Sequence, residues 1–383
     1  MSCSSISAPP DHRDAPRHDV AEVCVFGPNY GECILVHVGD HKWVIIDSCV
    51  NESGRAEALQ YLEDIGVDAS TSVSCVIASH WHDDHVRGIS EIIAQCNNSD
   101  FVCPAALSKR EFFEIAAAGG MEVFFANTGV REFKKVLTHL KARNKVPVFA
   151  SEGHRLLLAK TTLGSVEIWA TSPSHQAFSE TLKWFASLVP RKNGPIGAIP
   201  IPPAPNDASI VIWIDFNWTQ LLLGSDMESH GDPASGWERI HFRHPANFPS
   251  QKGTLFKIPH HGSENGYFRG VWEDMLHPEP VAILSPFLNG AVKLPTAVEV
   301  DRINKHTTNG FITGDGRRRP KINRPAAVQR ILRQCPSPPT TPVMPNGWVR
   351  CRAQNLGNPQ WEVQLFGHAK KLSDHASIIA KQV

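Results

Sequence analysis

SHWHDDHVRG, residues 79–88, is the most informative stretch of this sequence. Within six positions it holds three histidines and two aspartates, directly after the apolar run VSCVIA at 73–78. Buried charges must be paired or bound to a metal, so a packed core cannot accommodate these side chains unassisted. The stretch therefore belongs either on a solvated surface loop or around a cation.

The composition is that of a globular protein without excess charge. The chain has 383 residues, 42% of them hydrophobic, with 38 basic and 38 acidic side chains. This length is enough for one large domain or two ordinary ones. Because the charges balance, no global field would attract a polyanion or a membrane surface, and nucleic-acid binding would need a local basic patch.

Cysteine usage and the first residues favour a reducing, cytoplasmic compartment. The nine cysteines are odd in number and include no Cys-x-x-Cys pair, which argues against a disulfide framework and against a zinc ribbon. Residues 1–19 lack the apolar core of a signal peptide, and their polar, Pro-rich composition predicts a disordered lead-in. No run of about 18 apolar residues occurs, so we expect no membrane-spanning segment.

Several apolar runs end in side chains that can bind a metal. These strand-like runs end at Asp47, His80, Asp226 and His260. Functional sites gather where strands end and loops begin, so the four ends predict one common site. We expect residues 20–315 to form this domain. Residues 316–383 are expected to be a C-terminal extension: a small additional sheet, an edge extension, or a docking surface for a protein partner.

The spacing within residues 80–85 separates the side chains into two groups. In an extended loop, His80 and His82 project to the same side and can bind one ion. Asp84 and His85 follow where the chain turns into a helix, and they can reach a second ion. Imidazole and carboxylate ligands suit Zn²⁺ at about 2.0–2.2 Å, and a mixed set also admits Mn²⁺ or Fe²⁺. We therefore expect two divalent ions, preferably zinc; the alternative is a solvated loop.

The pattern His-x-His-x-Asp-His resembles the hallmark of the metallo-β-lactamase superfamily. LLLGSDMES at 221–229 resembles the Gly-Asp motif of that superfamily. LFKIPHHGSENG at 255–266 and NDASIVIWI at 206–214 are similar to motifs of its ComEC-like branch, found in DNA-uptake proteins and in soluble stand-alone relatives. The resemblance runs from about residue 22 to 315 and implies an α+β fold, a four-layer αββα sandwich.

The resemblance also implies a ligand set. The implied metal ligands are His80, His82, Asp84, His85, Asp226 and His260. The implied catalytic residues are Asp84, Asp226 and His261. Asp226 is expected to bridge the two metals. Of the adjacent histidines, His260 is expected to bind the second metal, while His261 faces the substrate or supports a ligand. Asp47 and Asn206 are expected to orient ligands, as supporting groups around metal sites do.

The chain departs from the superfamily at positions that bear on the substrate. Gly31-Glu32 stands where Gly-Asp is usual, and Leu294 replaces a late histidine of the branch, next to Lys293. The implied substrate-binding residues are Lys257, Ser263 and Lys293.

The first metal has no certain third histidine. His175 is the nearest histidine, although a loop residue is the better interpretation of it, and Asn206 or Asp207 could take that place instead.

These features predict a metal-dependent hydrolase. Two metals lower the pKa of a bridging water towards about 7, which supplies hydroxide at neutral pH. The resemblance favours phosphodiesters, as small molecules or nucleic acids. The basic run DGRRRPKINRP at 315–325 could neutralise phosphates, although such a run can also be a solvated surface. The alternatives are hydrolysis of a carbonyl compound (lactone, thioester or lactam) and a metal-binding sensor or scaffold with little activity.

Overall fold

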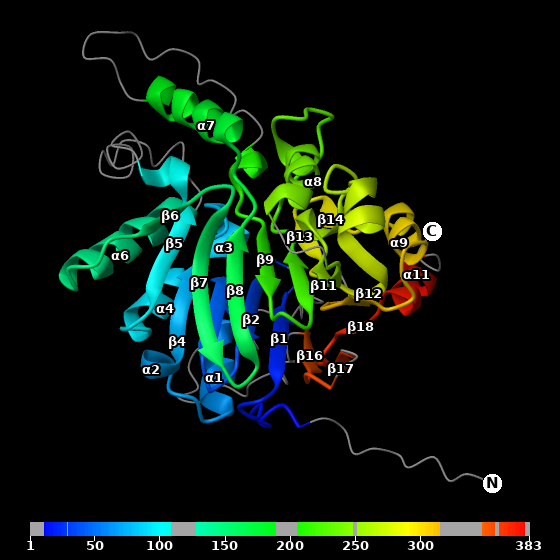
Figure 1. Ribbon diagram of the computed structural model, residues 1–383, viewed down its shortest axis with the longest axis horizontal. Helices are drawn as coiled ribbons and strands as arrows, with labels where there is room; N and C mark the ends of the chain where they lie inside the picture. The colour runs from blue at the N-terminus through cyan, green and yellow to red at the C-terminus, as the bar shows by residue number, and fades with distance from the viewer. Residues whose placement is uncertain are drawn as a thin grey trace, which may run out of the picture.

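Two facing eight-stranded sheets form the centre of the computed structural model, which describes residues 11–28, 30–108, 128–188, 205–247, 251–314, 347–356 and 360–379. The first sheet has the strand order β17-β16-β1-β2-β3-β4-β5-β6, and the second has the order β18-β15-β12-β11-β10-β9-β8-β7. Helices cover both outer faces (Figure 1). The predicted α+β, four-layer αββα sandwich is therefore confirmed.

The strands of the first sheet run antiparallel up to β3 and parallel from β3 to β6. Their bounds are β1 Ala21–Phe26, β2 Cys33–His37, β3 Trp43–Asp47, β4 Val73–Ile77, β5 Asp100–Pro104, β6 Val148–Ala150, β16 Trp348–Ala353 and β17 Glu362–Phe366. Because parallel strands end at the same edge of a sheet, the loops after β3 and β4 lie side by side.

The second sheet repeats this arrangement, antiparallel from β7 to β10 and parallel from β10 through β11 and β12 to β15. Its strands are β7 His154–Thr161, β8 Gly164–Ala170, β9 Ile212–Asp215, β10 Gln220–Leu223, β11 Gly253–Lys257, β12 Leu276–Leu284, β15 Gly310–Ile312 and β18 Lys370–Lys371. A separate hairpin consists of β13 Phe287–Asn289 and β14 Val292–Leu294.

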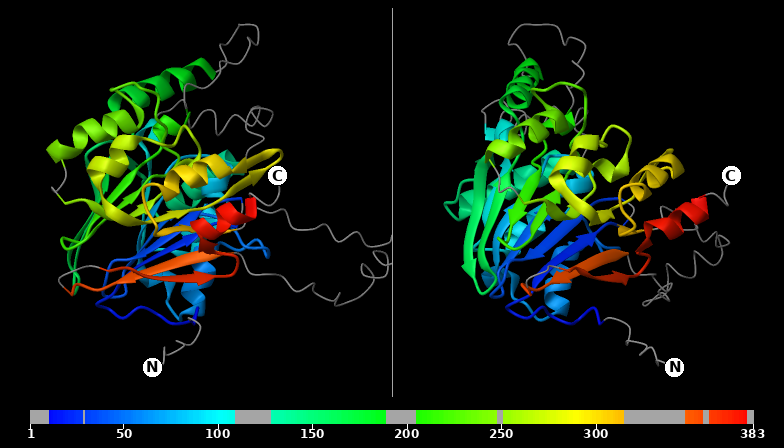
Figure 2. Two further views of the ribbon diagram at one scale, coloured as in Figure 1. Left: turned by 90° about the vertical axis from the view of Figure 1, so that its right-hand side faces the viewer. Right: turned by 45° about the vertical axis from the view of Figure 1, so that its right-hand side comes forward.

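The helices form the two outer layers and the short connections. On the first sheet lie α1 Glu57–Asp64, α4 Ile89–Gln95 and α6 Thr128–Ala142. On the second lie α8 Gly236–Asn247, α9 Ala297–Asn304 and α11 Leu372–Ile379, the last two visible in yellow and red in Figure 2. The remaining helices and helical turns are α2 Ala69–Ser72, α3 Asp83–Val86, α7 His175–Leu188, η1 Ala105–Ser108, η2 Pro205–Ala208, η3 His260–Gly262 and η4 Val271–Met275.

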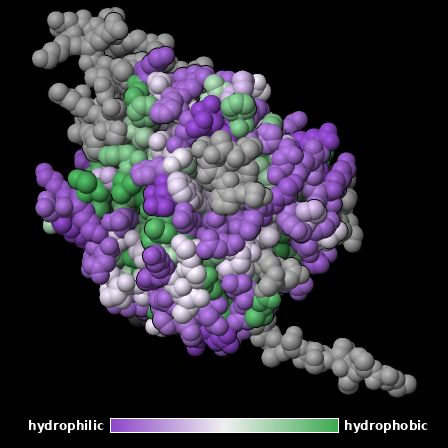
Figure 3. Space-filling model, viewed as in Figure 1, coloured by the Kyte–Doolittle hydropathy of each residue, from purple (hydrophilic) through white to green (hydrophobic). Residues whose placement is uncertain are grey.

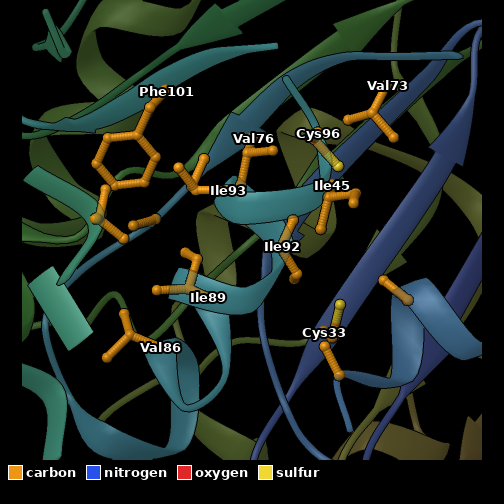
Figure 4. Close-up of a cluster of buried hydrophobic side chains, with 14 of the residues drawn as sticks. Cys33, Ile45, Val73, Val76, Val86, Ile89, Ile92, Ile93, Cys96 and Phe101 are labelled. Carbon is orange, nitrogen blue, oxygen red and sulfur yellow. The ribbon is translucent and has the colours of Figure 1, made fainter. Parts of the chain in front are cut away.

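The core consists of three apolar layers because both faces of each sheet are covered. Successive side chains of a strand point to opposite faces. In β3, Trp43 and Ile45 therefore join the layer under the helices, where Figure 4 shows Ile45 together with Ile92 of α4. Val44 and Ile46 of the same strand join the layer between the two sheets. This double burial explains why the strands are continuous apolar runs and do not alternate with polar residues.

The C-terminal residues are part of the sandwich. β16 pairs with β1 and carries β17 at the sheet edge, while β18 pairs with β15 of the second sheet. Figure 2 shows β16 and β17 in orange beside the blue first sheet. Of the alternatives for residues 316–383, the described part therefore takes the place of an edge extension. The basic run at 315–325 lies outside the described residues.

Residues 11–19, for which the composition predicts disorder, contact these C-terminal strands. The guanidinium of Arg350 donates to the carbonyls of Asp11 and Asp14, at 2.8 and 3.3 Å. Arg352 pairs with Asp14 and with the buried Glu22. The reason is that β16 presents two arginines to this segment; residues 1–10 lie outside the described residues.

The surface and the cysteines agree with an ordinary globular chain. Seven cysteines of the described residues are free and buried: Cys24, Cys33, Cys49, Cys75, Cys96, Cys103 and Cys351. One face of the molecule is mostly hydrophilic (Figure 3). Among the described residues, no helix combines the length and the apolar character needed to cross a membrane.

Truncating the layer between the sheets should destabilise the protein. Ile168 of β8 is fully buried in that layer, so Ile168→Ala should lower the free energy of unfolding by about 2–5 kcal/mol. Val298 is 74% exposed, and Val298→Ala should change it by about 0.5 kcal/mol at most. Urea denaturation measures both, and equal effects of the two variants would contradict this layered core.

Candidate metal centre

Four strands bring the predicted side chains to one edge of the sandwich. In the first sheet, Asp47 ends β3 and His80 follows β4. In the second sheet, Asp226 follows β10 and His261 follows β11. The short helix α3 begins at Asp83, inside the histidine motif, and lies toward the α7 end of the sandwich in Figure 1. The site therefore draws on both sheets.

Two groups of possible ligand atoms meet at Asp226. The first group is His80, His82 and Asp226, and the second is Asp84, His85, Asp226 and His261; the ligand atoms of each group lie within 4.8 Å of one another. Asp226 Oδ2 lies 3.7 Å from His80 Nε2, and Asp226 Oδ1 lies 3.2 Å from His85 Nε2. Asp226 is therefore the residue that the two groups share.

Unpaired buried atoms at the meeting point indicate that the groups fit divalent ions. His80 Nε2, His85 Nε2 and Asp226 Oδ1 are buried and have no hydrogen-bond partner. Leaving such an atom unpaired costs about 1–3 kcal/mol, and a bound cation removes that cost. Imidazole nitrogens with carboxylate oxygens are a donor set that zinc, manganese and iron accept. The residues present therefore fit two divalent ions.

The carboxylates of the second ligand group favour positive charge on His85, whereas burial lowers the pKa of His80. Burial opposes protonation of His85, but the carboxylates of Asp226, Asp47 and Asp84 outweigh burial and raise the pKa of His85 well above its usual value. Burial likewise raises the pKa of Asp226, but the neighbouring His85 outweighs it, so that the pKa of Asp226 falls well below its ordinary value. Because a ligand histidine must be neutral, metal binding here would release a proton.

Asp47 contacts His85 directly and His80 through Ser79, and so reaches the histidines of both groups. Asp47 Oδ2 accepts a hydrogen bond from His85 Nδ1 at 2.7 Å and another from the Ser79 hydroxyl at 2.7 Å. Ser79 Oγ in turn lies 3.0 Å from His80 Nδ1 and accepts a hydrogen bond from the Ser225 hydroxyl at 2.8 Å. These contacts occupy Nδ1 of both histidines, and Nε2 is left to face the ligand groups.

The structure places His261, and not His260, in the second ligand group. His261, expected to face the substrate, joins the second ligand group, with Nε2 at 3.2 Å from Asp84 Oδ2. His260, the expected ligand, points instead to Glu228, with Nδ1 at 3.2 Å from Oε1. The reason is the tight turn η3, in which both histidines have left-handed backbone conformations, with φ of 47° and 53°. This turn directs the second imidazole inward.

Two of the predicted substrate-binding residues have other roles. Lys257 is fully buried and forms an ion pair with Glu32 at 2.5 Å, because it ends a strand between two others and points between the sheets. The hydroxyl of Ser263 donates to Asn265 Oδ1 at 2.6 Å and thereby stabilises its own loop. Lys293 lies exposed on the β13–β14 hairpin, opposite Leu288.

The residues considered for a third ligand of the first metal form a separate polar network. Asn206, predicted to orient a ligand, instead donates a hydrogen bond to Glu228 Oε1 at 2.6 Å. Asp207 Oδ1 lies 2.9 Å from His230 Nε2, and burial raises the pKa of Asp207 to about 6. His175 is exposed at the start of α7. In the described residues, the first group therefore holds three side chains.

Sequence reasoning missed most of the supporting residues. Ser79 carried a signal, because it directly precedes His80. Ser225, Ser285 and Glu228 follow strands as ordinary loop residues, and only their contacts across the sandwich identify them. Glu32 departs from the usual Gly-Asp pattern, but its ion pair with Lys257 joins residues too far apart in the chain to be predicted from the sequence.

A family model described as the metallo-beta-lactamase superfamily matches residues 26–116. No curated protein matches the chain. Three solved structures share 12–17% identity with it: a Cronobacter sakazakii metallo-beta-lactamase with a HARLDQ motif (17%; 61% of this chain, 73% of that chain; TM-score 0.33), the metallo-beta-lactamase fold protein YhfI from Bacillus subtilis (12%; 62% and 70%; 0.32), and MEM-A1, a subclass B3 metallo-beta-lactamase from a soil metagenome (12%; 66% and 83%; 0.31).

The matched segment carries Asp47 and the motif HWHDDH. Together with the αββα sandwich, this match supports placing the chain in the metallo-β-lactamase superfamily. The fold is of the metallo-β-lactamase type, and its two ligand groups fit divalent ions.

Removing the charge of Asp47 should weaken metal binding. Asp47→Asn keeps the shape of the side chain but takes away the carboxylate that holds His85 and Ser79. We expect the affinity for Zn²⁺ to fall about 10–100-fold, as measured by titration calorimetry against a competing chelator. Asp301 is an exposed aspartate of α9, and Asp301→Asn should bind as the wild type does. Unchanged affinity in Asp47→Asn would contradict the supporting role.

Proposed function

We propose that this chain hydrolyses phosphodiesters as a soluble member of the ComEC-like branch, with zinc as the preferred ion. The observation that carries the proposal is the shared Asp226, which places two ligand groups side by side. Paired divalent ions, when bound, would activate water and stabilise charge on phosphoryl oxygens. A phosphodiester offers two non-bridging oxygens to such a pair, whereas a carbonyl offers only one.

The unequal ligand groups support catalysis over a purely structural site. The first group has three side chains and the second has four. A structural zinc site is closed by four protein ligands, whereas a catalytic site keeps a position open for water or substrate. Asp84 and Asp226 are members of these ligand groups, and the carboxylate of either residue can also orient a water molecule. The sensor or scaffold alternative is therefore the weaker one.

An aromatic pair beside the second group supports a substrate that carries a base or another aryl group. The ring of Phe287, at the start of the β13–β14 hairpin, lies 5.0 Å from the ring of His261. The ring of Tyr30 lies 5.6 Å from Phe287, and its hydroxyl donates to Asp83. Both rings are partly exposed. Nucleobases stack on exposed aromatic rings whatever the nucleotide sequence, because every base has an aromatic face. Lys293 on the same hairpin adds a positive charge for phosphate.

The same aromatic surface would also accept the apolar part of a lactone, thioester or lactam, which keeps a carbonyl substrate as the second candidate.

A cytoplasmic location and a protein partner at the C-terminal strands remain predictions.

A direct assay separates the two candidates. Wild-type protein supplied with Zn²⁺ or Mn²⁺ is expected to cleave single-stranded DNA, double-stranded DNA, RNA or bis(p-nitrophenyl) phosphate. Asp84→Asn should lower kcat by about 100-fold or more, because it removes a carboxylate that can assist proton transfer. Asp301→Asn is the matched control and should be as active as the wild type. Metal-loaded wild type that cleaves lactones or thioesters but none of the phosphodiesters would overturn the proposal.

Truncation of the aromatic pair should affect binding of the polymer. Phe287→Ala is expected to raise KM for single-stranded DNA about tenfold, since stacking of one base contributes about 1–3 kcal/mol. Val292→Ala, at a half-exposed position of the same hairpin, should leave KM unchanged. Steady-state kinetics with a fluorescent oligonucleotide measures both, and equal KM values for the two variants would argue against stacking on Phe287.

A further inference from the structure

A buried ion pair joins the two sheets beneath the second ligand group. Lys257 Nζ lies 2.5 Å from Glu32 Oε2, and the side chains of Lys257 and Glu32 are 0% and 1% exposed. Lys257 ends β11 of the second sheet, and Glu32 directly precedes β2 of the first. The desolvation of two charges offsets most of their attraction, so stability alone is a weak reason for such a pair.

Glu32 is linked, directly or through one neighbour, to three side chains of the second group: Asp84, His85 and His261. Its backbone N–H donates to the carbonyl of Asp84 at 2.8 Å. Its carboxylate accepts a hydrogen bond from the Ser285 hydroxyl, and the Ser285 carbonyl accepts one from His261 Nδ1 at 3.1 Å. A carboxylate oxygen of Glu32 also lies within 4.8 Å of ligand-type atoms of Asp47 and His85.

We propose that the Glu32–Lys257 pair positions the second ligand group and thereby sets the affinity of that metal position. Lys257 supplies the positive charge that holds the Glu32 carboxylate close to the carboxylate of Asp47. Without this charge, the two carboxylates repel each other and Glu32 turns away. Ser285 then loses its acceptor, and the segments that present His261 and Asp84 shift. The inference rests on the two-metal site and is independent of the substrate.

The first ligand group is linked to this pair only indirectly, through Asp47. His80 is held through Ser79, which contacts Asp47 and Ser225 and makes no hydrogen bond with Glu32 or Lys257. The loss of the ion pair should therefore affect the two metal positions unequally. A general loss of stability would weaken both.

The test is the metal-binding isotherm of Lys257→Met, measured by Co²⁺ titration against a competing chelator, with metal content determined after dialysis. Wild type should bind two ions. Lys257→Met should bind one ion with wild-type affinity and the other about 10–100-fold more weakly, the effect typical of groups that support metal ligands. Circular dichroism checks that the variant is folded.

A double variant and a matched control complete the experiment. Glu32→Leu with Lys257→Met leaves no unpaired charge, so it should fold even where Lys257→Met does not. Because it also removes the acceptor of the Ser285 hydroxyl, it should show the same weak position. Glu22 forms a comparable buried pair with Arg352 at 2.6 Å, remote from both ligand groups, and Glu22→Gln should keep both metal affinities. Wild-type affinity at both positions in the double variant, or equal weakening in Glu22→Gln, would overturn the proposal.

Discussion

The attraction between one buried carboxylate and its imidazoles is the interaction on which the site depends. Asp226 is 3% exposed and belongs to both ligand groups. A charge at this depth is tolerated only when it is paired or bound to a metal. Its contacts with His80 and His85 join a loop of the second sheet to the motif that follows β4 of the first. Any shift of one sheet against the other would separate these atoms.

The apolar layer between the sheets prevents such a shift. Ile46 directly precedes Asp47, Ile77 lies three residues before His80, and Leu223 lies three residues before Asp226; all three apolar side chains pack in that layer. Protein interiors are packed as densely as organic crystals, so the strand ends have little freedom. The supporting polar groups then act over short distances, as Asp47 does for His85.

Two features of the site favour a catalytic role: the negative charge of its carboxylates and the incomplete set of side chains in the first ligand group. Carboxylates concentrate at one edge, their negative charge favours cations, and the group with only three side chains leaves room for water or substrate. The buried pair of Glu32 and Lys257 lies on the side of the second group, whereas the rings of Tyr30 and Phe287 are partly exposed next to it. In our proposals, metal affinity and substrate recognition therefore depend on different residues of the same edge.

The sequence by itself determined the layered fold and most members of the two candidate ligand groups, because both follow from local residue patterns. Continuous apolar runs predict strands that are buried on both faces, and the spacing of His80, His82 and Asp84 brings their side chains together within a few residues. Only the tertiary structure decided between His260 and His261 and placed Lys257 against Glu32. The physical reason is that a tight turn orients the histidines, and that the partners of the ion pair are far apart in the chain and meet only when the two sheets pack together.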